Sequence, residues 1–161
     1  MPQLYTVPLG PWERFTTPAG EVLACTACEY PVQMVFAVGP VQPSASPWAT
    51  NEVFLRNVAS AAEQERTARC LVASDGEASV ASGGMLITIV RTGIGELAGL
   101  PALEYEATVT IRGRTLRQSG AVVVHWNRLL RIAVLRTDGP VCAKEREAVS
   151  ALRSGIRLAT D

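Results

Sequence analysis

Residues 103–111 read LEYEATVTI, the strictest alternation of apolar and polar side chains in the chain. Successive side chains of a β-strand point to opposite faces of its sheet, so this period of two predicts a strand with one buried and one solvated face. The expected buried row is Leu103, Tyr105, Val109 and Ile111, and the expected solvated row is Glu104, Glu106 and Thr108. A sheet with one face in water is typical of antiparallel strands.

The residues after this stretch predict two more strands. Arg112-Gly113-Arg114 has the composition of a turn, residues 116–126 return, Asn127-Arg128 turns again, and residues 129–137 run back. Short turns of this kind join antiparallel neighbours. The C-terminal half is therefore expected to be a three-strand antiparallel meander.

The remaining chain is predicted to supply further strands and two helices. Residues 4–38 resemble short strands separated by turn residues, and residues 39–50 contain three prolines, which predict a loop. Apolar residues at helical spacing predict one helix at 51–69 and another at 142–154. The expected fold class is α+β, an antiparallel sheet in an α/β/α sandwich-like arrangement, forming one domain over residues 1–161.

Composition excludes several classes of function. Fifteen basic residues balance fifteen acidic ones, so the clustered positive charge of a nucleic-acid-binding protein is not expected. No apolar run is long enough for a membrane span. The first residues lack the basic and apolar regions of a signal peptide, which leaves two alternatives: a cytoplasmic protein that starts here, or an envelope protein in which Met1 replaces an export signal.

Cys25 and Cys28 form a Cys-x-x-Cys motif, the spacing of redox-active dithiols and of half of many zinc sites. A redox-active pair needs its first cysteine at a helix N-terminus, whereas Pro31 disfavours a helix there. Zinc takes four ligands, and Cys70 and Cys142 stand alone in the sequence. We expect neither a metal site nor a catalytic dithiol. Whether the four cysteines are buried thiols or the disulfides of an exported protein is left open.

No other motif predicts catalysis. His125 is the only histidine and lies in a predicted strand, where a sheet histidine with one hydrogen-bond partner is expected. The glycines at 93, 95 and 99 resemble a dinucleotide fingerprint, but a strand rather than a helix follows them, so we expect 93–99 to be a loop. Without a nucleophile elbow, a P-loop or a zinc-protease motif, the sequence predicts no catalytic residue, no cofactor and no enzyme.

Residues 121–124 and 129–135 are apolar at nearly every position. Strands with one wet face would alternate, so both faces of these strands need cover. Two alternatives remain: a helix on each face, or an apolar face that takes a segment of a partner protein. For the second alternative, the candidate binding residues are Val122, Val124, Trp126, Leu130, Ile132 and Val134, with Arg131 at the rim.

The run GLPALEY at 99–105, the turn at 112–114, the strands at 122–126 and 129–135 and the final helix together resemble the PsbP-like/DcrB-like fold. The pattern covers about 110 residues, and a helix before the meander also fits it. The resemblance implies a mostly non-enzymatic protein. One branch of the fold comprises exported or lipid-anchored bacterial proteins, and another comprises small cytoplasmic chaperones that shield apolar N-terminal segments of type VI secretion effectors.

The leading hypothesis is a cytoplasmic, non-enzymatic adaptor or chaperone that binds a protein partner with an apolar segment, such as a secreted effector. The second hypothesis is an exported or lipid-anchored envelope assembly domain. The third is a thiol redox or metal site at Cys25 and Cys28. Because a neutral surface opposes self-association only weakly, a homodimer is a further expectation.

Overall fold

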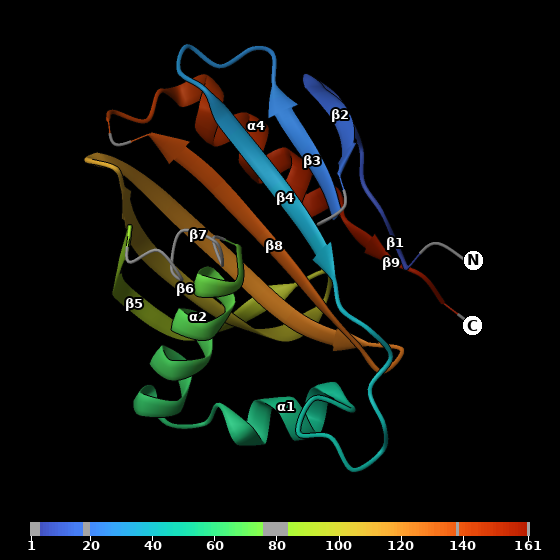
Figure 1. Cartoon of the computed structure of the whole chain (residues 1–161). Helices are drawn as coiled ribbons and strands as arrows, with labels where there is room; N and C mark the ends of the chain where they lie inside the picture. The colour runs from blue at the N-terminus through green and yellow to red at the C-terminus, as the bar shows by residue number, and fades with distance from the viewer. Residues whose placement is uncertain (1–3, 18–19, 76–83, 138, 161) are drawn as a thin grey trace.

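A computed structural model of the chain describes residues 4–17, 20–75, 84–137 and 139–160. Seven strands form one antiparallel sheet in the order β2-β3-β4-β8-β7-β6-β5, and β1 pairs with β9 where the two ends of the chain meet (Figure 1). The strands are β1 Tyr5–Thr6, β2 Trp12–Thr17, β3 Gly20–Cys25, β4 Val32–Val38, β5 Met85–Leu97, β6 Leu100–Ile111, β7 Arg114–His125, β8 Arg128–Thr137 and β9 Arg157–Leu158. The described helices are α1 Asn51–Asn57, α2 Ala61–Asp75 and α4 Ala143–Gly155. The predicted α+β class is confirmed.

Strands β5 to β8 form a meander of four strands, one more than the sequence predicts. Two-residue turns connect them, and both residues of each turn have positive φ. The turns are Ala98 (51°) and Gly99 (84°), Arg112 (52°) and Gly113 (77°), and Trp126 (51°) and Asn127 (59°). Turns of this type match the right-handed twist of the flanking strands, so they favour tight hairpins between these long strands.

The segment 93–99 was expected to be a loop, and this prediction was wrong because β5 continues through it to Leu97. A Cβ added at Gly95 would lie 1.4 Å from the Oε1 atom of Glu104. Glycine is therefore needed at this position for the Glu104 side chain to lie across β5. It marks a close approach within the sheet rather than a turn.

The helix predicted at 51–69 is two helices, and the second continues to Asp75. The break falls at 58–60, where Ser60 begins a new helix. Its hydroxyl accepts a hydrogen bond from the Glu63 N–H (3.2 Å), and its carbonyl accepts one from the Gln64 N–H (3.0 Å). The Gln64 side chain donates to the Val58 carbonyl (3.0 Å). The carbonyl of Val58 therefore has a hydrogen-bond partner although the helix is interrupted there.

The helices cover opposite faces of the sheet (Figure 1). Helices α1 and α2 pack on one face of β5, β6 and β7, which we name the α2 face. Helix α4 packs on the other face, against residues of β3, β4 and β8, and this is the α4 face. Among the described residues, no helix has the length and apolar character that a membrane crossing requires.

The double cover explains the apolar strands. Val122 and Val124 of β7 lie in the core beneath α1 and α2, whereas Ala121 and Val123 lie in the core beneath α4. A strand that lies between two helical layers has no wet face, so its sequence cannot alternate. A helix on each face, one of the two alternatives left open by the sequence, is therefore what the structure has.

The alternation of residues 103–111 is confirmed. Leu103, Tyr105 and Val109 are buried on the α2 face, and Ile111 is half-buried there. The side chains of Glu104 and Glu106 are 39% and 41% exposed on the α4 face. Strand β6 thus combines one core face with one accessible face, as its sequence predicts.

Tyr5 and Ala159, near the two ends of the chain, contact residues of the large sheet. The Tyr5 ring stacks on Phe36 with centroids 5.1 Å apart, and its hydroxyl donates to Glu21 (2.9 Å). Burial, together with this carboxylate, raises the pKa of the Tyr5 phenol. The Nε2 atom of His125 lies 2.7 Å from the Ala159 carbonyl oxygen, so the expected sheet histidine with a hydrogen-bond partner is confirmed.

Replacing Val109 with Asp is expected to destabilise the protein by about 3 kcal/mol or more, because it buries an unpaired charge on the α2 face. The matched control is Thr108→Asp, which places the same charge on the accessible face of the same strand. Urea unfolding measures both free energies. Equal stability of the two variants would contradict the assignment of faces.

Candidate binding groove

The seven predicted binding residues do not form one face, which corrects the expectation. Cross-strand pairing places three of them on the α2 face, three on the α4 face and one in a turn. They are, in that order, Val122, Val124 and Arg131; Leu130, Ile132 and Val134; and Trp126. The apolar runs misled the prediction because neighbouring residues of a strand alternate between faces even when all of them are apolar.

The three residues on the α2 face are inside the core. Val122 and Val124 are buried under the helices, and Arg131 is only 4% exposed. Arg131 donates to the Tyr105 hydroxyl (3.1 Å) and to Gln118 Oε1 (3.3 Å), and the Tyr105 hydroxyl donates to Gln118 (2.6 Å). Arg131 therefore belongs to a buried polar cluster, not to the rim of a binding surface.

On the α4 face, a groove lies beside α4 because the helix leaves part of β5, β6 and β7 uncovered. Three adjoining hollows of about 440, 410 and 220 Å³ make up this groove, and Ser119 of β7 lines all of them. We name it the α4 groove. Its centre, Ser119, is exposed, so a segment can reach the junction of the hollows from solvent.

The hollow of about 410 Å³ is the apolar end of the groove. Its lining includes Met34, Ala121, Ile132, Val134, Val141 and Val149. Ile132 and Val134 belong to the predicted binding set, and Leu130 is buried in the same core. Two of the seven predicted residues thus line this hollow, Ile132 buried and Val134 half-buried.

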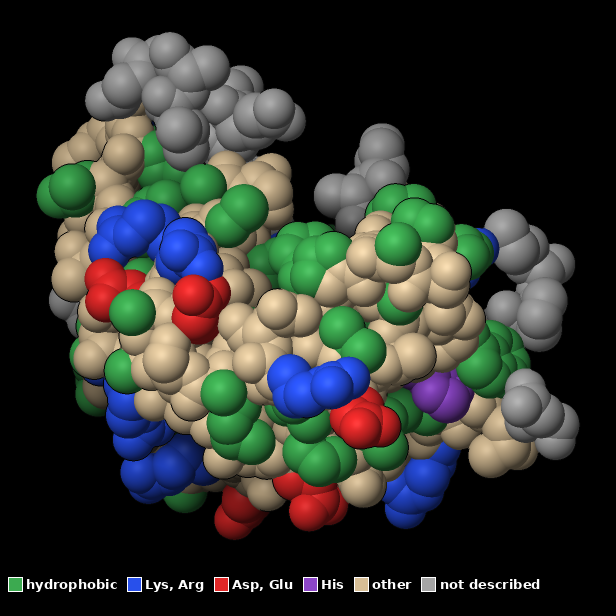
Figure 2. All heavy atoms as spheres, turned by 90° about the horizontal axis from the view of Figure 1, so that it is seen from below, with side chains coloured by type: hydrophobic (Ala, Val, Ile, Leu, Met, Phe, Trp, Pro, Cys, Tyr) green, Lys and Arg blue, Asp and Glu red, His purple; other side chains and the backbone are tan. Residues whose placement is uncertain are grey.

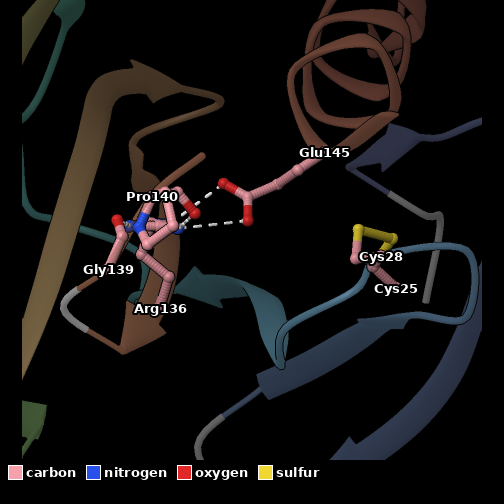
Figure 3. A network of polar contacts seen from close by, with 6 residues as sticks. All are labelled: Cys25, Cys28, Arg136, Gly139, Pro140 and Glu145. Carbon is pink, nitrogen blue, oxygen red and sulfur yellow. Dashed lines mark hydrogen bonds and ion pairs between the residues drawn. A yellow bond between two sulfur atoms is a disulfide. The ribbon is translucent and has the colours of Figure 1, made fainter. Parts of the chain in front are cut away.

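Arg136 and Glu145 close the apolar end (Figure 3). The guanidinium contacts both carboxylate oxygens, with Nε–Oε2 at 3.0 Å and Nη2–Oε1 at 3.3 Å. It also donates to the carbonyls of Gly139 (2.8 Å) and Pro140 (2.9 Å). Because the side chains of Arg136 and Glu145 are only 10% and 4% exposed, we assign this pair to fixing α4 against β8 rather than to binding.

The hollow of about 440 Å³ is the polar end, at the edge strand β5. Arg91 pairs with Glu106 (2.7 Å), and Arg153 of α4 pairs with Glu104 (3.3 Å). Arg153 also donates to the Glu96 carbonyl (3.0 Å). Between these two ion pairs the lining includes Gly93, which has no side chain.

No sequence pattern predicted the groove residues Ser119, Gly93, Val149 and Arg153. Alternation along β7 would have placed Ser119 on the same face as Ala121, and helical spacing would have placed Val149 and Arg153 on one side of α4. Neither pattern reveals that α4 stops short of β5. The position of a helix across a sheet depends on packing between distant segments.

A second surface, on the α2 face of β2, β3 and β4, is also free of any described helix. Val22, Ala24, Val35 and Ala37 lie there half-buried, and Phe15 is 48% exposed. Seen from the α1 end, the molecule is hollowed near its middle, with hydrophobic side chains beside the hollow and charges of both signs interspersed (Figure 2). This surface is the main competitor of the α4 groove.

Cys25 and Cys28 form a disulfide at the end of β3 (Figure 3), and Cys70 and Cys142 are free. Both bridged residues pack against the core beneath α4. Within the described ranges, no group of three or more His, Cys, Asp or Glu side chains could hold a metal ion. Because both cysteines pack against that core, we expect the disulfide to hold the end of β3 in place.

Removing the disulfide by the double change Cys25→Ser and Cys28→Ser is expected to lower the free energy of unfolding by about 2 kcal/mol, because the loop that it closes is short. Unfolding in urea with and without reductant measures this. Reductant should bring the wild type to the stability of the variant and leave the variant unchanged. A variant as stable as the oxidised wild type would contradict the structural role.

Breaking the buried ion pair by Arg136→Met is expected to cost about 3–5 kcal/mol, because Glu145 is left without its partner. The double variant Arg136→Met, Glu145→Leu should recover much of that loss, since no buried charge remains. A double-mutant cycle in urea measures the coupling. Additive losses would show that the pair does not hold α4 in place.

Several solved structures have the same fold as this chain. No protein-family model matches this sequence, and no curated protein matches it. Among solved structures, LpqN of Mycobacterium tuberculosis, involved in cell envelope biogenesis, matches with TM-score 0.55 and 11% identity over 97% of this chain and 83% of LpqN. PA94 of Pseudomonas aeruginosa, of unknown function, matches with TM-score 0.54 and 11% identity over 93% and 97% of the two chains. CyanoP, the PsbP of the cyanobacterium Synechocystis, matches with TM-score 0.53 and 10% identity over 92% and 82%. None of the three is described as an enzyme, and the likeness shows that this chain has the PsbP-like/DcrB-like fold.

Proposed function

We propose that this protein is a non-enzymatic adaptor or chaperone that holds an apolar segment of a partner protein in the α4 groove. One observation carries the proposal: an accessible apolar hollow of about 410 Å³ lies between α4 and the sheet. A segment seated there is covered by the helix on one side and by β7 and β8 beneath. Removing its apolar surface from water supplies the driving force for binding.

The apolar lining beside α4 favours a polypeptide segment as the ligand of the groove. Five arginines line the groove. Arg91, Arg136 and Arg153 are each paired with a glutamate, and Arg117 and Arg146 are the other two. The formal charge of the whole chain is zero. Apolar contact, and not charge, is then the main source of affinity.

Two settings fit this activity. The first is a cytoplasmic chaperone for a secreted effector, the setting implied by one branch of the fold. The second is an envelope assembly domain, which two observations favour: the Cys25–Cys28 disulfide, since such bonds persist mainly in oxidising compartments, and the likeness to LpqN. Thiol trapping in cells that produce the full-length protein separates them, because the pair should be reduced in the first setting and oxidised in the second.

The test of the binding activity uses Ser119→Trp, which fills the junction of the three hollows from an exposed position. The probe is a fluorescein-labelled peptide of alternating leucine and serine, and fluorescence anisotropy measures its Kd. We expect the wild type to bind the peptide and Ser119→Trp to weaken binding at least about tenfold. Unchanged circular dichroism and Tm establish that the variant is folded.

The matched control is Gln33→Trp, an exposed position on the opposite face of the sheet. It should bind the peptide as the wild type does. If Gln33→Trp loses binding and Ser119→Trp keeps it, the peptide occupies the competing surface and the α4 groove is not the site. Absence of binding by the wild type would also count against the proposal.

A further inference from the structure

Gly93 is the one glycine within a described strand interior whose identity the molecule itself does not require. A Cβ at Gly95 would meet the Glu104 carboxylate at 1.4 Å, and a Cβ at Gly120 would meet the Tyr105 ring at 2.2 Å. At Gly93 an added Cβ would meet nothing within 4 Å, and its φ lies outside the positive range that favours glycine. Any small residue would fit there.

A glycine inside a strand weakens that strand, because it gains no packing and loses more chain entropy than other residues. A close approach of another backbone is one physical reason for a glycine inside a strand, and no contact at its Cβ position explains Gly93. Gly93 lines the polar hollow of about 440 Å³ at the edge strand β5. The space above Gly93 is therefore continuous with the apolar end of the α4 groove, because Ser119, Gly120 and Arg153 line both hollows.

The two arginines beside this space keep unused donors. Arg91 bonds Glu106 through Nη2 only, and Arg153 uses Nη2 only for its bonds to Glu104 and Glu96, as far as the described residues go. The Nε and Nη1 groups of both side chains remain available to an acceptor. Arg91 is also 73% exposed at its side chain, so it can turn towards a ligand.

We infer that the partner's segment leaves the apolar end of the α4 groove in an extended conformation and that its main chain crosses β5 directly above Gly93, where Arg91 and Arg153 donate to its carbonyls. This inference rests on the proposed function and specifies the segment's conformation and path. The partner's main chain then crosses the α4 face of β5 and β6, at the edge of the sheet.

An extended main chain fits this place better than a carboxylate or a bulky side chain does. Glu104 and Glu106 neutralise the two arginines, so the hollow offers an anion no net positive charge. A main-chain carbonyl is a neutral acceptor that still benefits from a charged donor. The missing side chain at Gly93 lets a second backbone come closer than a residue with a side chain would allow.

The experiment fills the space with Gly93→Trp and uses Gly139→Trp as its matched control. Gly139 also has open space at its Cβ and a φ outside the positive range, and it lines none of the three hollows. With the leucine–serine peptide as probe, Gly93→Trp should raise Kd at least about tenfold, and Gly139→Trp should not change it. Gly93→Ala should raise the Tm, because alanine restricts the unfolded chain, and this rise verifies that the position is free of strain.

The carbonyl contacts are tested with peptides in which single amides are replaced by esters, which are weaker acceptors. Esters at the end of the peptide that crosses β5 should weaken binding to the wild type and not to an Arg91→Met, Arg153→Met double variant. If Ser119→Trp weakens binding while Gly93→Trp does not, the crossing is refuted and the proposed function stands. If neither variant weakens binding, both fail.

Discussion

Burial of β7 and β8 on both faces is the constraint on which the rest of the structure depends. Val122 and Val124 face α1 and α2, while Val123 and Leu130 face α4. Each helical layer is narrower than a sheet of seven strands, so the layers overlap only over the central strands. Each layer then leaves part of its face without a helix: β5 and β6 on the α4 side, and β2, β3 and β4 on the α2 side.

The α4 groove follows from that offset. Its apolar end is the margin of the core beneath α4, where Ile132 is buried and Val134 is half-buried. Its polar end is the accessible row of β6, whose glutamates pair with Arg91 and Arg153. Because α4 is narrower than the sheet, the uncovered margin beside it presents apolar and polar contacts side by side. The Arg136–Glu145 pair holds α4 in this position.

Local sequence patterns were sufficient for β6, β7 and β8 and the two turns between them, and insufficient for β5 and for the site. The alternation at 103–111 and the turn residues at 112–113 act through neighbours in the sequence, so they could be interpreted without the fold. The loop expected at 93–99 and the single helix expected at 51–69 were wrong, because Gly95 accommodates the Glu104 side chain and Ser60 begins a new helix. The expectation that the seven binding residues share one face was wrong for a related reason, since apolar residues alternate between two faces that only the positions of α2 and α4 distinguish.

The balance of charge in the groove bears on how selective this protein can be. Arginines that are already paired, as Arg91, Arg136 and Arg153 are, recognise a partner's charge weakly, because any new ion pair must compete with an existing one. Main-chain carbonyls and apolar side chains are common to many extended segments. A groove that recognises these features distinguishes partners by exposed apolar sequence and by an extended path, which suits a protein that keeps such a segment from aggregating until it is delivered.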